Sequence, residues 1–200
     1  MNLPTDILPE RHPLQPFLPI HAKILMLGSF PPQGKRWSMP FFYPNIQNDM
    51  WRIFGLIFFQ DKEYFYDRKE KRFIMKRLVA FLEERGIALY DTATCVKRLK
   101  NNASDAHLEI IEETDIHSLL HRIPQCKAVI ATGEKAATVV ARQFNLPPLT
   151  IGKGIKTPSI TFYRMPSSSR SYPLALEKKA TFYQQAFEQT VPEIFLPTSV

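Results

Sequence analysis

Short apolar runs alternate with amphipathic stretches along this chain, and this alternation constrains the fold more than any other feature. The apolar runs predict four buried strands, at residues 23–27, 87–90, 127–131 and 159–163. Apolar residues three or four positions apart predict helices that start at 48, span 68–85, run from 114 to before 124, and span 134–144 and 174–187. Strands that alternate with helices usually form a mostly parallel sheet covered on both faces. We therefore expect an α/β fold with three layers, α/β/α, around a central, mostly parallel four-stranded sheet.

The length of the chain and the composition of its first residues indicate how it is organised. Two hundred residues suit one domain with a sizeable core, so we expect residues 1–200 to form a single domain. Prolines recur through residues 1–20, which predicts an arm that packs irregularly against the body of the domain. Gly86 is expected to end the helix over 68–85.

Bulk composition excludes several classes of protein and identifies none. The chain has 26 Lys and Arg against 19 Asp and Glu, a net charge of +7, which is compatible with a nucleic-acid partner and equally with solubility alone. Cys95 and Cys126 lack a paired spacing such as C-x-x-C, which argues against a zinc site or a disulfide framework. No apolar run approaches the roughly 20 residues that span a bilayer, and the N-terminus has no signal-peptide pattern. We expect a soluble cytoplasmic protein, nucleoid-associated if prokaryotic, with no membrane partner and no metal.

The loops that follow the first, second and fourth predicted strands form the candidate site. In sheets of this kind, ligands bind beyond the carboxyl ends of the strands. The first of these loops, residues 29–47, is rich in proline and aromatic residues and has no helical period. Long ordered loops in compact domains are usually functional, so this loop is the strongest candidate.

Three blocks of sequence in and around this loop carry a resemblance to a known family. They are Gly-Ser-Phe-Pro-Pro at 28–32, the aromatic pair at 42–43 and Asn-Asp-Met-Trp at 48–51. Together they resemble the uracil-DNA glycosylase superfamily, nearest to its mismatch-specific uracil and hypoxanthine-DNA glycosylases. Further blocks follow in the expected order, at 88–91, 116–137 and 165–169. The resemblance implies a monofunctional DNA glycosylase of base excision repair that hydrolyses the N-glycosidic bond of hypoxanthine or uracil in damaged double-stranded DNA, without a metal or other cofactor.

Asn48 is the candidate catalytic residue. The resemblance places the catalytic asparagine of the hypoxanthine branch here, and an amide side chain can donate to a base carbonyl while it accepts from a water. Asn48 also directly precedes a helical pattern, so it is equally suited to an N-cap. Tyr43 is the candidate for stacking on a flipped base, supported by Phe42, although both rings could instead fill the core.

The remaining candidates for the base pocket lie at the ends of the first two predicted strands. Gly28, Ser29, Phe30 and Pro31 supply backbone amides near the end of the first strand, where a small residue permits close approach. Uracil-specific enzymes carry Asp or Asn where Phe30 stands, whereas the hypoxanthine branch is apolar there, which favours hypoxanthine as the substrate. Asp91 ends the second strand and is a candidate general base, or a cap for the turn that follows it.

DNA-binding residues are expected on two loops. The hydroxyls and amides of Ser167, Ser168 and Ser169 could bind phosphate oxygens, with Arg170 adding charge, although an ordinary Ser-rich turn would look the same. Lys35 and Arg36 in the first loop, with Lys97, Arg98 and Lys100 on a loop after the second strand, are expected to form a basic rim. The basic run at 68–77 is expected to be a solvated helix face.

Two other classes of function compete with the enzyme. The first is a non-catalytic module of the same fold that binds damaged or single-stranded DNA, which Phe30 supports together with Met165, a position where the superfamily often has His or Asn. The second is a nucleotide-binding or hydrolytic α/β enzyme. Residues 132–137 do not form G-x-G-x-x-G, no Walker lysine motif is present, and Ser29 lacks a G-x-S-x-G elbow, so this class is disfavoured. No feature identifies a protein partner.

Overall fold

The computed structural model describes residues 7–99 and 107–196, and within them the central sheet has five strands rather than the expected four. Their order is β5 (Ile87–Asp91), β2 (Ile24–Gly28), β8 (Ala128–Ala131), β10 (Thr161–Arg164) and β9 (Ile155–Lys156). The first four are the strands that the apolar runs predict, and they run parallel to one another. The additional strand, β9, pairs antiparallel with the edge of β10. Two residues are too few to show a periodicity in the sequence.

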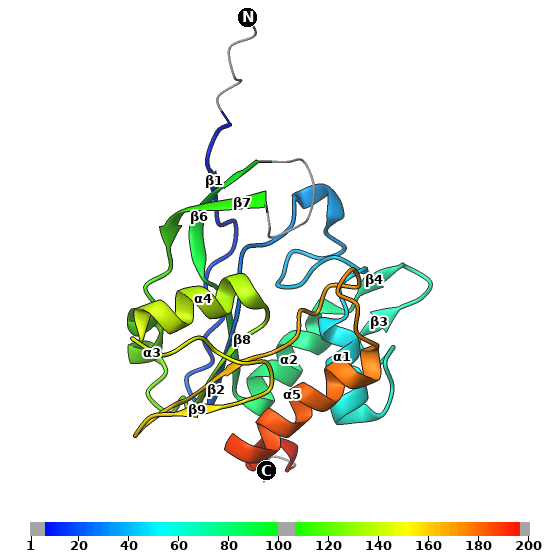
Figure 1. The fold of residues 1–200 in the computed structure, drawn as a ribbon. Coiled ribbons are helices and arrows are strands. Elements are labelled where there is room, and N and C mark those ends of the chain that lie inside the picture. The colour runs from blue at the N-terminus through cyan, green and yellow to red at the C-terminus, as the bar shows by residue number, and fades with distance from the viewer. Residues whose placement is uncertain (1–6, 100–106, 197–200) are drawn as a thin grey trace, which may run out of the picture.

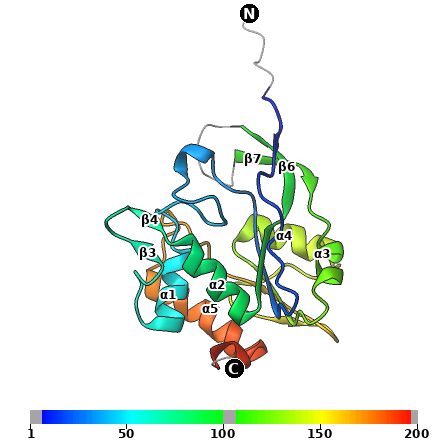
Figure 2. The ribbon, with the colours of Figure 1, turned by 180° about the vertical axis from the view of Figure 1, so that it is seen from behind.

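Helices cover both faces of this sheet, as expected for an α/β fold. The described residues form α1 (Met50–Phe59), α2 (Met75–Arg85), α3 (Ile116–Arg122), α4 (Glu134–Gln143) and α5 (Leu176–Thr190). Figures 1 and 2 show α3 and α4 on one side of the sheet and α1, α2 and α5 on the other. On the second side, α1 packs against α5 through Phe54 and Phe187, whose ring centroids lie 5.9 Å apart. None of these helices is long and apolar enough to cross a membrane.

A second, antiparallel sheet corrects two expectations. It consists of β1 (Glu10–Arg11), β6 (Ala93–Arg98) and β7 (Leu108–Glu113), so part of the proline-rich arm is a regular strand, and Lys97 and Arg98 lie in a strand rather than on a loop. The buried Arg98 guanidinium donates to both carboxylate oxygens of Glu10, at 3.1 Å each, and to the carbonyl of Pro31 at 3.2 Å. These partners are distant in sequence, so no local pattern reveals them. Lys100 lies outside the described residues.

Residues 66–73 form a hairpin, and the expectation that they begin a helix is wrong. Strands β3 (Tyr66–Asp67) and β4 (Arg72–Phe73) pair antiparallel, and the helix begins only at Met75. The Asp67 carboxylate accepts from the amides of Lys69 and Glu70, which closes a tight turn in place of a helical one. Exposed Arg68, Lys69, Lys71 and Arg72 therefore lie on a hairpin and not on a helix face.

The parallel strands bring four loops to one edge of the central sheet. The pairing places Gly28 beside Asp91, Leu27 beside Ala131, and Ala131 beside Arg164. The loops expected to form the site therefore converge beyond the carboxyl ends of β2, β5 and β10. The loop after β8, which begins at Thr132, joins them and was not expected to contribute.

Gly86 ends α2 in the left-handed conformation, with φ +67°, and so confirms the expected stop. A methyl group at this position would lie 2.9 Å from the His21 carbonyl oxygen. We predict that Gly86→Ala lowers the free energy of unfolding by about 1–2 kcal/mol, measured by urea denaturation. Gly34→Ala is the matched control, because nothing lies within 4 Å of the added methyl group there. Equal stability of the two variants would contradict the prediction.

Candidate active site

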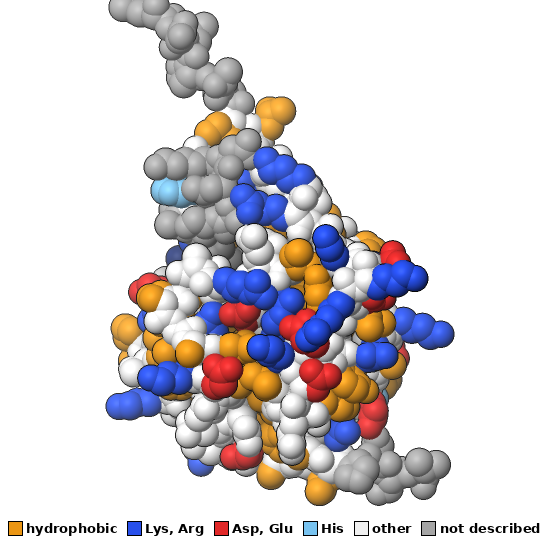
Figure 3. All heavy atoms as spheres, turned by 90° about the vertical axis from the view of Figure 1, so that its right-hand side faces the viewer, with side chains coloured by type: hydrophobic (Ala, Val, Ile, Leu, Met, Phe, Trp, Pro, Cys, Tyr) orange, Lys and Arg blue, Asp and Glu red, His pale blue; other side chains and the backbone are white. Residues whose placement is uncertain are grey.

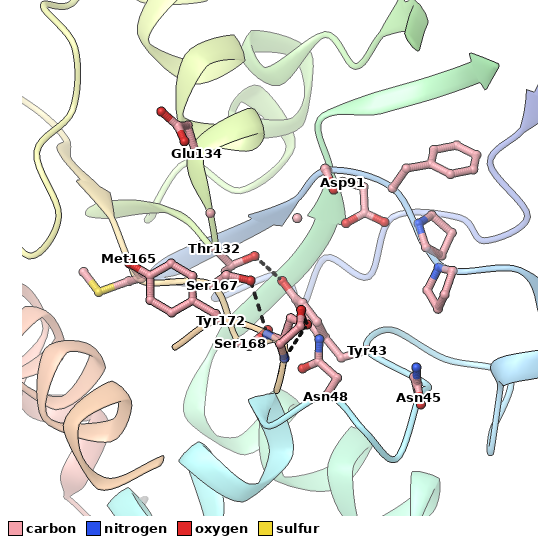
Figure 4. Close-up of a pocket in the computed structure, with 18 of the residues that line it drawn as sticks. Tyr43, Asn45, Asn48, Asp91, Thr132, Glu134, Met165, Ser167, Ser168 and Tyr172 are labelled. Atoms are coloured by element: carbon pink, nitrogen blue, oxygen red, sulfur yellow. Dashed lines mark hydrogen bonds between the residues drawn. The ribbon is translucent and has the colours of Figure 1, made fainter. Parts of the chain in front are cut away.

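A cavity of about 500 Å³ opens at this edge of the sheet. Figure 4 shows Tyr43, Asn48, Asp91 and Thr132 around it, although they come from three separate parts of the chain. The predicted residues that line it are Gly28, Ser29, Phe30, Pro31, Phe42, Tyr43, Asn48, Asp91, Ser167, Ser168 and Ser169. Three predicted DNA-binding residues do not line it: Lys35, Arg36 and Arg170. The structure thus brings the predicted base-pocket residues together. Of the predicted cations among the described residues, Arg98 lines the cavity, and Lys35, Arg36, Lys97 and Arg170 do not.

Asn48 caps α1 and also presents its amide group to the cavity. Its Oδ1 atom accepts a hydrogen bond from the Met50 amide at 2.9 Å, which is the capping role that the sequence allowed. Its backbone forms an isolated β-bridge with Ser169. Within the described residues the side-chain Nδ2 has no protein partner, so this donor is available to a ligand.

A cluster of the buried Asp49 and Lys179 with the half-exposed Arg170, which we call the Asp49 cluster, joins the start of α1 to the serine loop at 166–173. Asp49 accepts from Arg170 Nε and from Lys179 Nζ, each at 3.0 Å. The Lys179 side chain, on α5, is only 1% exposed and donates a further bond to the Ser169 carbonyl at 2.7 Å. The Asp49 amide donates to the Ser168 carbonyl at 2.7 Å. A charge buried this deeply is stable only when it is paired and fully hydrogen-bonded, so these contacts fix the two segments against each other.

Tyr183 provides a second contact between α5 and the serine loop. Its hydroxyl is buried and donates to the Pro166 carbonyl at 3.3 Å. Burial raises the pKa of Tyr183 well above its usual value, with a smaller contribution from Tyr43. The hydroxyl therefore keeps its proton at neutral pH and remains a donor to the loop.

Tyr43 is held in a strained backbone conformation at the wall of the cavity. Its φ is +48°, in the left-handed region that an aromatic residue rarely adopts. The hydroxyl lies 3.1 Å from Thr132 Oγ1, and the ring packs edge-on against Trp51. Strain of this kind costs about 1–3 kcal/mol. It persists only where the surrounding contacts hold the residue in place, which is often the case at ligand sites. Phe42, by contrast, is 3% exposed and packs among core aromatic rings, although it also reaches the cavity wall.

Asp91 contacts a histidine from the N-terminal arm, not the turn that follows it. His12 Nε2 lies 2.9 Å from Asp91 Oδ2, and the His12 side chain is 2% exposed. The imidazole packs against Tyr90 and Phe30, at centroid distances of 4.7 and 5.3 Å. Sequence reasoning missed His12 completely, because no spacing relates it to a residue 79 positions away. A histidine between Arg11 and Pro13 in a proline-rich arm is the only local signal.

The serine loop is stabilised largely by its own hydroxyls. Ser167 Oγ accepts from the Ser169 amide at 3.2 Å, and Ser169 Oγ lies 2.8 Å from Ser171 Oγ. This is the Ser-rich turn that the sequence allowed, and it leaves the loop at the cavity mouth. Met165, which opens the loop, is fully buried, and its amide donates to the Ala131 carbonyl at 2.8 Å.

Most of the predicted basic residues lie around the cavity, whereas Arg98 is part of its wall. Lys35 and Arg36 are exposed on a short 3-10 helix, η1 (Gly34–Arg36), in the loop after β2. Arg170 is tied through Nε to Asp49, and about half of its side chain stays exposed. Figure 3 shows further Lys and Arg side chains, interleaved with acids, on the face that carries the β3–β4 hairpin. Sequence reasoning also missed Arg164, which lines the cavity from the end of β10.

No group of three or more His, Cys, Asp or Glu side chains able to hold a metal ion occurs among the described residues.

Comparison with known proteins identifies the family. The model of the uracil DNA glycosylase superfamily matches residues 15–191, which includes every segment around the cavity. The chain belongs to the uracil DNA glycosylase superfamily. A solution NMR structure from Methanosarcina acetivorans, provisionally named a uracil DNA glycosylase, superposes with a TM-score of 0.59 at 19% identity. The match covers 90% of this chain and 99% of that one, and at this identity it supports the fold alone. No curated protein matches the chain.

The contacts of the Asp49 cluster lead to a prediction about stability when one of its charges is removed. We expect Lys179→Met to lower the free energy of unfolding by about 3 kcal/mol or more, because it leaves Asp49 buried with Arg170 as its only cation. Lys178→Met is the matched control, since Lys178 is exposed on the same helix and should change stability by less than about 0.5 kcal/mol. Urea denaturation measures both. A Lys179→Met protein as stable as the control would show that the cluster does not hold the two segments together.

Proposed function

We propose that this protein is a monofunctional DNA glycosylase that hydrolyses the N-glycosidic bond of a deaminated base, hypoxanthine or uracil, in double-stranded DNA during base excision repair. The observation that carries the proposal is the Asn48 side chain, whose Oδ1 is held by the Met50 amide while Nδ2 stays available at the cavity. This donor is oriented before any ligand binds, which is the arrangement that stabilises developing negative charge at least cost. Membership of the superfamily supports the reaction class.

The cavity has the size and composition of a site for a flipped base. Its volume of about 500 Å³ lies within the range of small-molecule sites. An enzyme that cuts a glycosidic bond must take the base out of the stack and hold it in such a pocket. Tyr43 supplies the aromatic face, and stacking on it would contribute about 1–3 kcal/mol. Asn48 Nδ2 donates to the base as the bond breaks and negative charge develops on it.

Hypoxanthine is the better candidate of the two bases. Phe30 occupies the wall beside the end of β2, is 8% exposed, and packs edge-on against His12. An apolar ring at this position resembles the hypoxanthine branch more than the uracil-specific enzymes. Phe30 also enlarges the apolar surface that a purine ring can contact.

DNA is held by groups at the mouth of the cavity and beyond it. The amides and hydroxyls of Ser167, Ser168 and Ser169 contact phosphates at the cavity mouth, because serine loops and backbone amides are common phosphate ligands. Lys35 and Arg36 extend this contact along the backbone, and the exposed half of Arg170 adds a third charge.

A non-catalytic module that binds damaged or single-stranded DNA is the second candidate function. Phe30 and the buried Met165 favour it, since neither can orient a water or donate to a base carbonyl. The two candidates differ in whether an abasic site is formed.

We predict that the protein releases the base from duplexes that carry hypoxanthine, and releases it faster than from matched duplexes that carry uracil. The measurement is alkali-induced cleavage of the abasic strand, with an undamaged duplex as the control. Tight binding to damaged DNA without abasic product would establish the binding module instead.

Substitution of Asn48 tests most directly how the base is excised. We expect Asn48→Ala and Asn48→Asp to excise at least about 100-fold more slowly under single-turnover conditions, with DNA affinity within about 3-fold of wild type. Asn48→Asp keeps the oxygen that caps the Met50 amide and removes the donor, so it separates catalysis from folding. Asp115→Ala is the control, because it removes a comparable cap from α3, far along the chain from Asn48. Excision by Asn48→Asp at the rate of Asp115→Ala would refute the role of Asn48.

A further inference from the structure

The described part of the cavity wall contains two carboxylates, and they differ in their surroundings. Glu134 has a side chain that is 78% exposed and lies 3.6 Å from Arg164. Asp91 has a side chain that is only 8% exposed, and it lies at the end of β5 beside Gly28. Of the two, only Asp91 is shielded from bulk water. A shielded carboxylate acts more strongly on a bound molecule than an exposed one does.

The two oxygens of Asp91 have different environments. Oδ2 is bound by His12 Nε2 at 2.9 Å. Oδ1 has no hydrogen-bond partner among the described residues and lies against Gly28, where an added methyl group would be 2.3 Å away from it. The same methyl group would lie 3.5 Å from the Tyr43 hydroxyl, and Figure 4 shows Asp91 and Tyr43 on the same side of the cavity. Oδ1 is therefore an unused acceptor at the corner where Tyr43 would hold the base.

The contacts of His12 specify which atom carries its proton. The Leu14 amide donates to Nδ1 at 3.1 Å, so Nδ1 is an acceptor in the neutral imidazole. The proton then lies on Nε2, which donates to Asp91 Oδ2. The Leu14 carbonyl is 3.0 Å from Nδ1, so a doubly protonated ring would also be satisfied. In either state the imidazole remains a donor to Asp91 and fixes the plane of the carboxylate.

Hydrolysis of a glycosidic bond needs a proton acceptor for the attacking water, and the other candidates at this end of the cavity are unsuited to it. Phe30 has no acceptor. Asn48 Oδ1 already accepts from the Met50 amide. Asp91 Oδ1 is both unpartnered and ionisable.

We propose that Asp91 is the catalytic carboxylate that receives the proton of the attacking water, and that His12 is a positioning residue that holds Asp91 for this task. The proposal rests on the proposed glycosylase function. In the reaction, the water oxygen bonds to the sugar C1′, the bond from C1′ to the base nitrogen breaks, and the base leaves with the electron pair. One water proton passes to Asp91 Oδ1, which later returns it to the departing base. One water is consumed, and no oxidant or reductant is needed.

Anchoring of the arm is a separate role, and other contacts already provide it. Before His12, Glu10 binds Arg98 and Arg11 binds Glu112. After it, the backbone of Phe17 pairs with that of Leu89, so the arm is joined to the body on both sides of His12. A contact that only attached the arm to the body would not require a buried histidine at the cavity wall. The Arg11–Glu112 pair is exposed and remote from the cavity lining, which makes it a matched control.

The test uses the full chain and the hypoxanthine duplex, with excision measured under single-turnover conditions. DNA affinity is measured on a duplex that carries a tetrahydrofuran abasic analogue, and folding is measured by thermal unfolding. We expect Asp91→Asn to slow excision at least about 100-fold with affinity within about 3-fold of wild type. His12→Phe keeps a ring against Phe30 and Tyr90 but removes the donor, and should slow excision about 10-fold or more. His12→Gln, which restores an N–H donor, should recover part of that loss.

A double-mutant cycle separates positioning from anchoring. If His12 acts through Asp91, His12→Phe has no further effect on the excision rate of Asp91→Asn. Glu112→Gln should leave the excision rate within about 2-fold of wild type.

Each other outcome overturns a stated part of the account. Excision by folded Asp91→Asn within about 3-fold of wild type overturns the role of Asp91, while the glycosylase function stands. If His12→Phe slows excision by the Asp91→Asn protein as much as it slows excision by wild type, His12 acts independently of Asp91. A wild-type protein that releases no base from any duplex overturns the proposed function, and this proposal with it.

Discussion

The buried Asp49 carboxylate is the constraint on which the rest of the site depends. It follows Asn48 directly and pairs with Lys179 and Arg170, which come from the opposite end of the chain. A carboxylate and an ammonium buried together are stable only in good hydrogen-bonding geometry, so the pair allows little freedom in how α1 begins or where the serine loop lies. The orientation of Asn48 is thereby constrained by residues that do not line the cavity. The amide that we propose to be catalytic and the loop that we propose to bind phosphate are positioned as one unit.

The opposite side of the cavity is fixed by the N-terminal arm in a similar way. Arg98 holds Glu10 and the Pro31 carbonyl, and His12 holds Asp91. Both sides therefore depend on polar contacts between residues 67 to 130 positions apart. The central sheet supplies the common edge, and these contacts convert the edge into a cavity with defined donors and acceptors. The strained backbone of Tyr43 fits this view, because only a rigid surrounding could hold it.

The sequence predicts the elements that have a periodic apolar pattern and the segments that match a family motif. The four parallel strands, the stop at Gly86 and the placement of Asn48 and Tyr43 at the site follow from periodicity, from glycine chemistry and from the resemblance. It does not predict His12 or Lys179, because nothing local distinguishes a buried polar residue from an exposed one. Strand β9 is too short to show a period, and the hairpin at 66–73 shares its apolar spacing with the helix that follows. Arg98 was expected on a basic rim and is instead a buried structural residue.

The central claim is that these contacts build a hydrolytic site for one flipped base. Mass spectrometry of the products from a hypoxanthine duplex, with and without borohydride, tests it most directly. The account predicts free hypoxanthine, an unbroken strand that carries an abasic sugar, and no covalent protein–DNA product with borohydride, because water and not a lysine attacks the sugar. A protein that binds the duplex without releasing the base, or that borohydride traps on the strand, would contradict it.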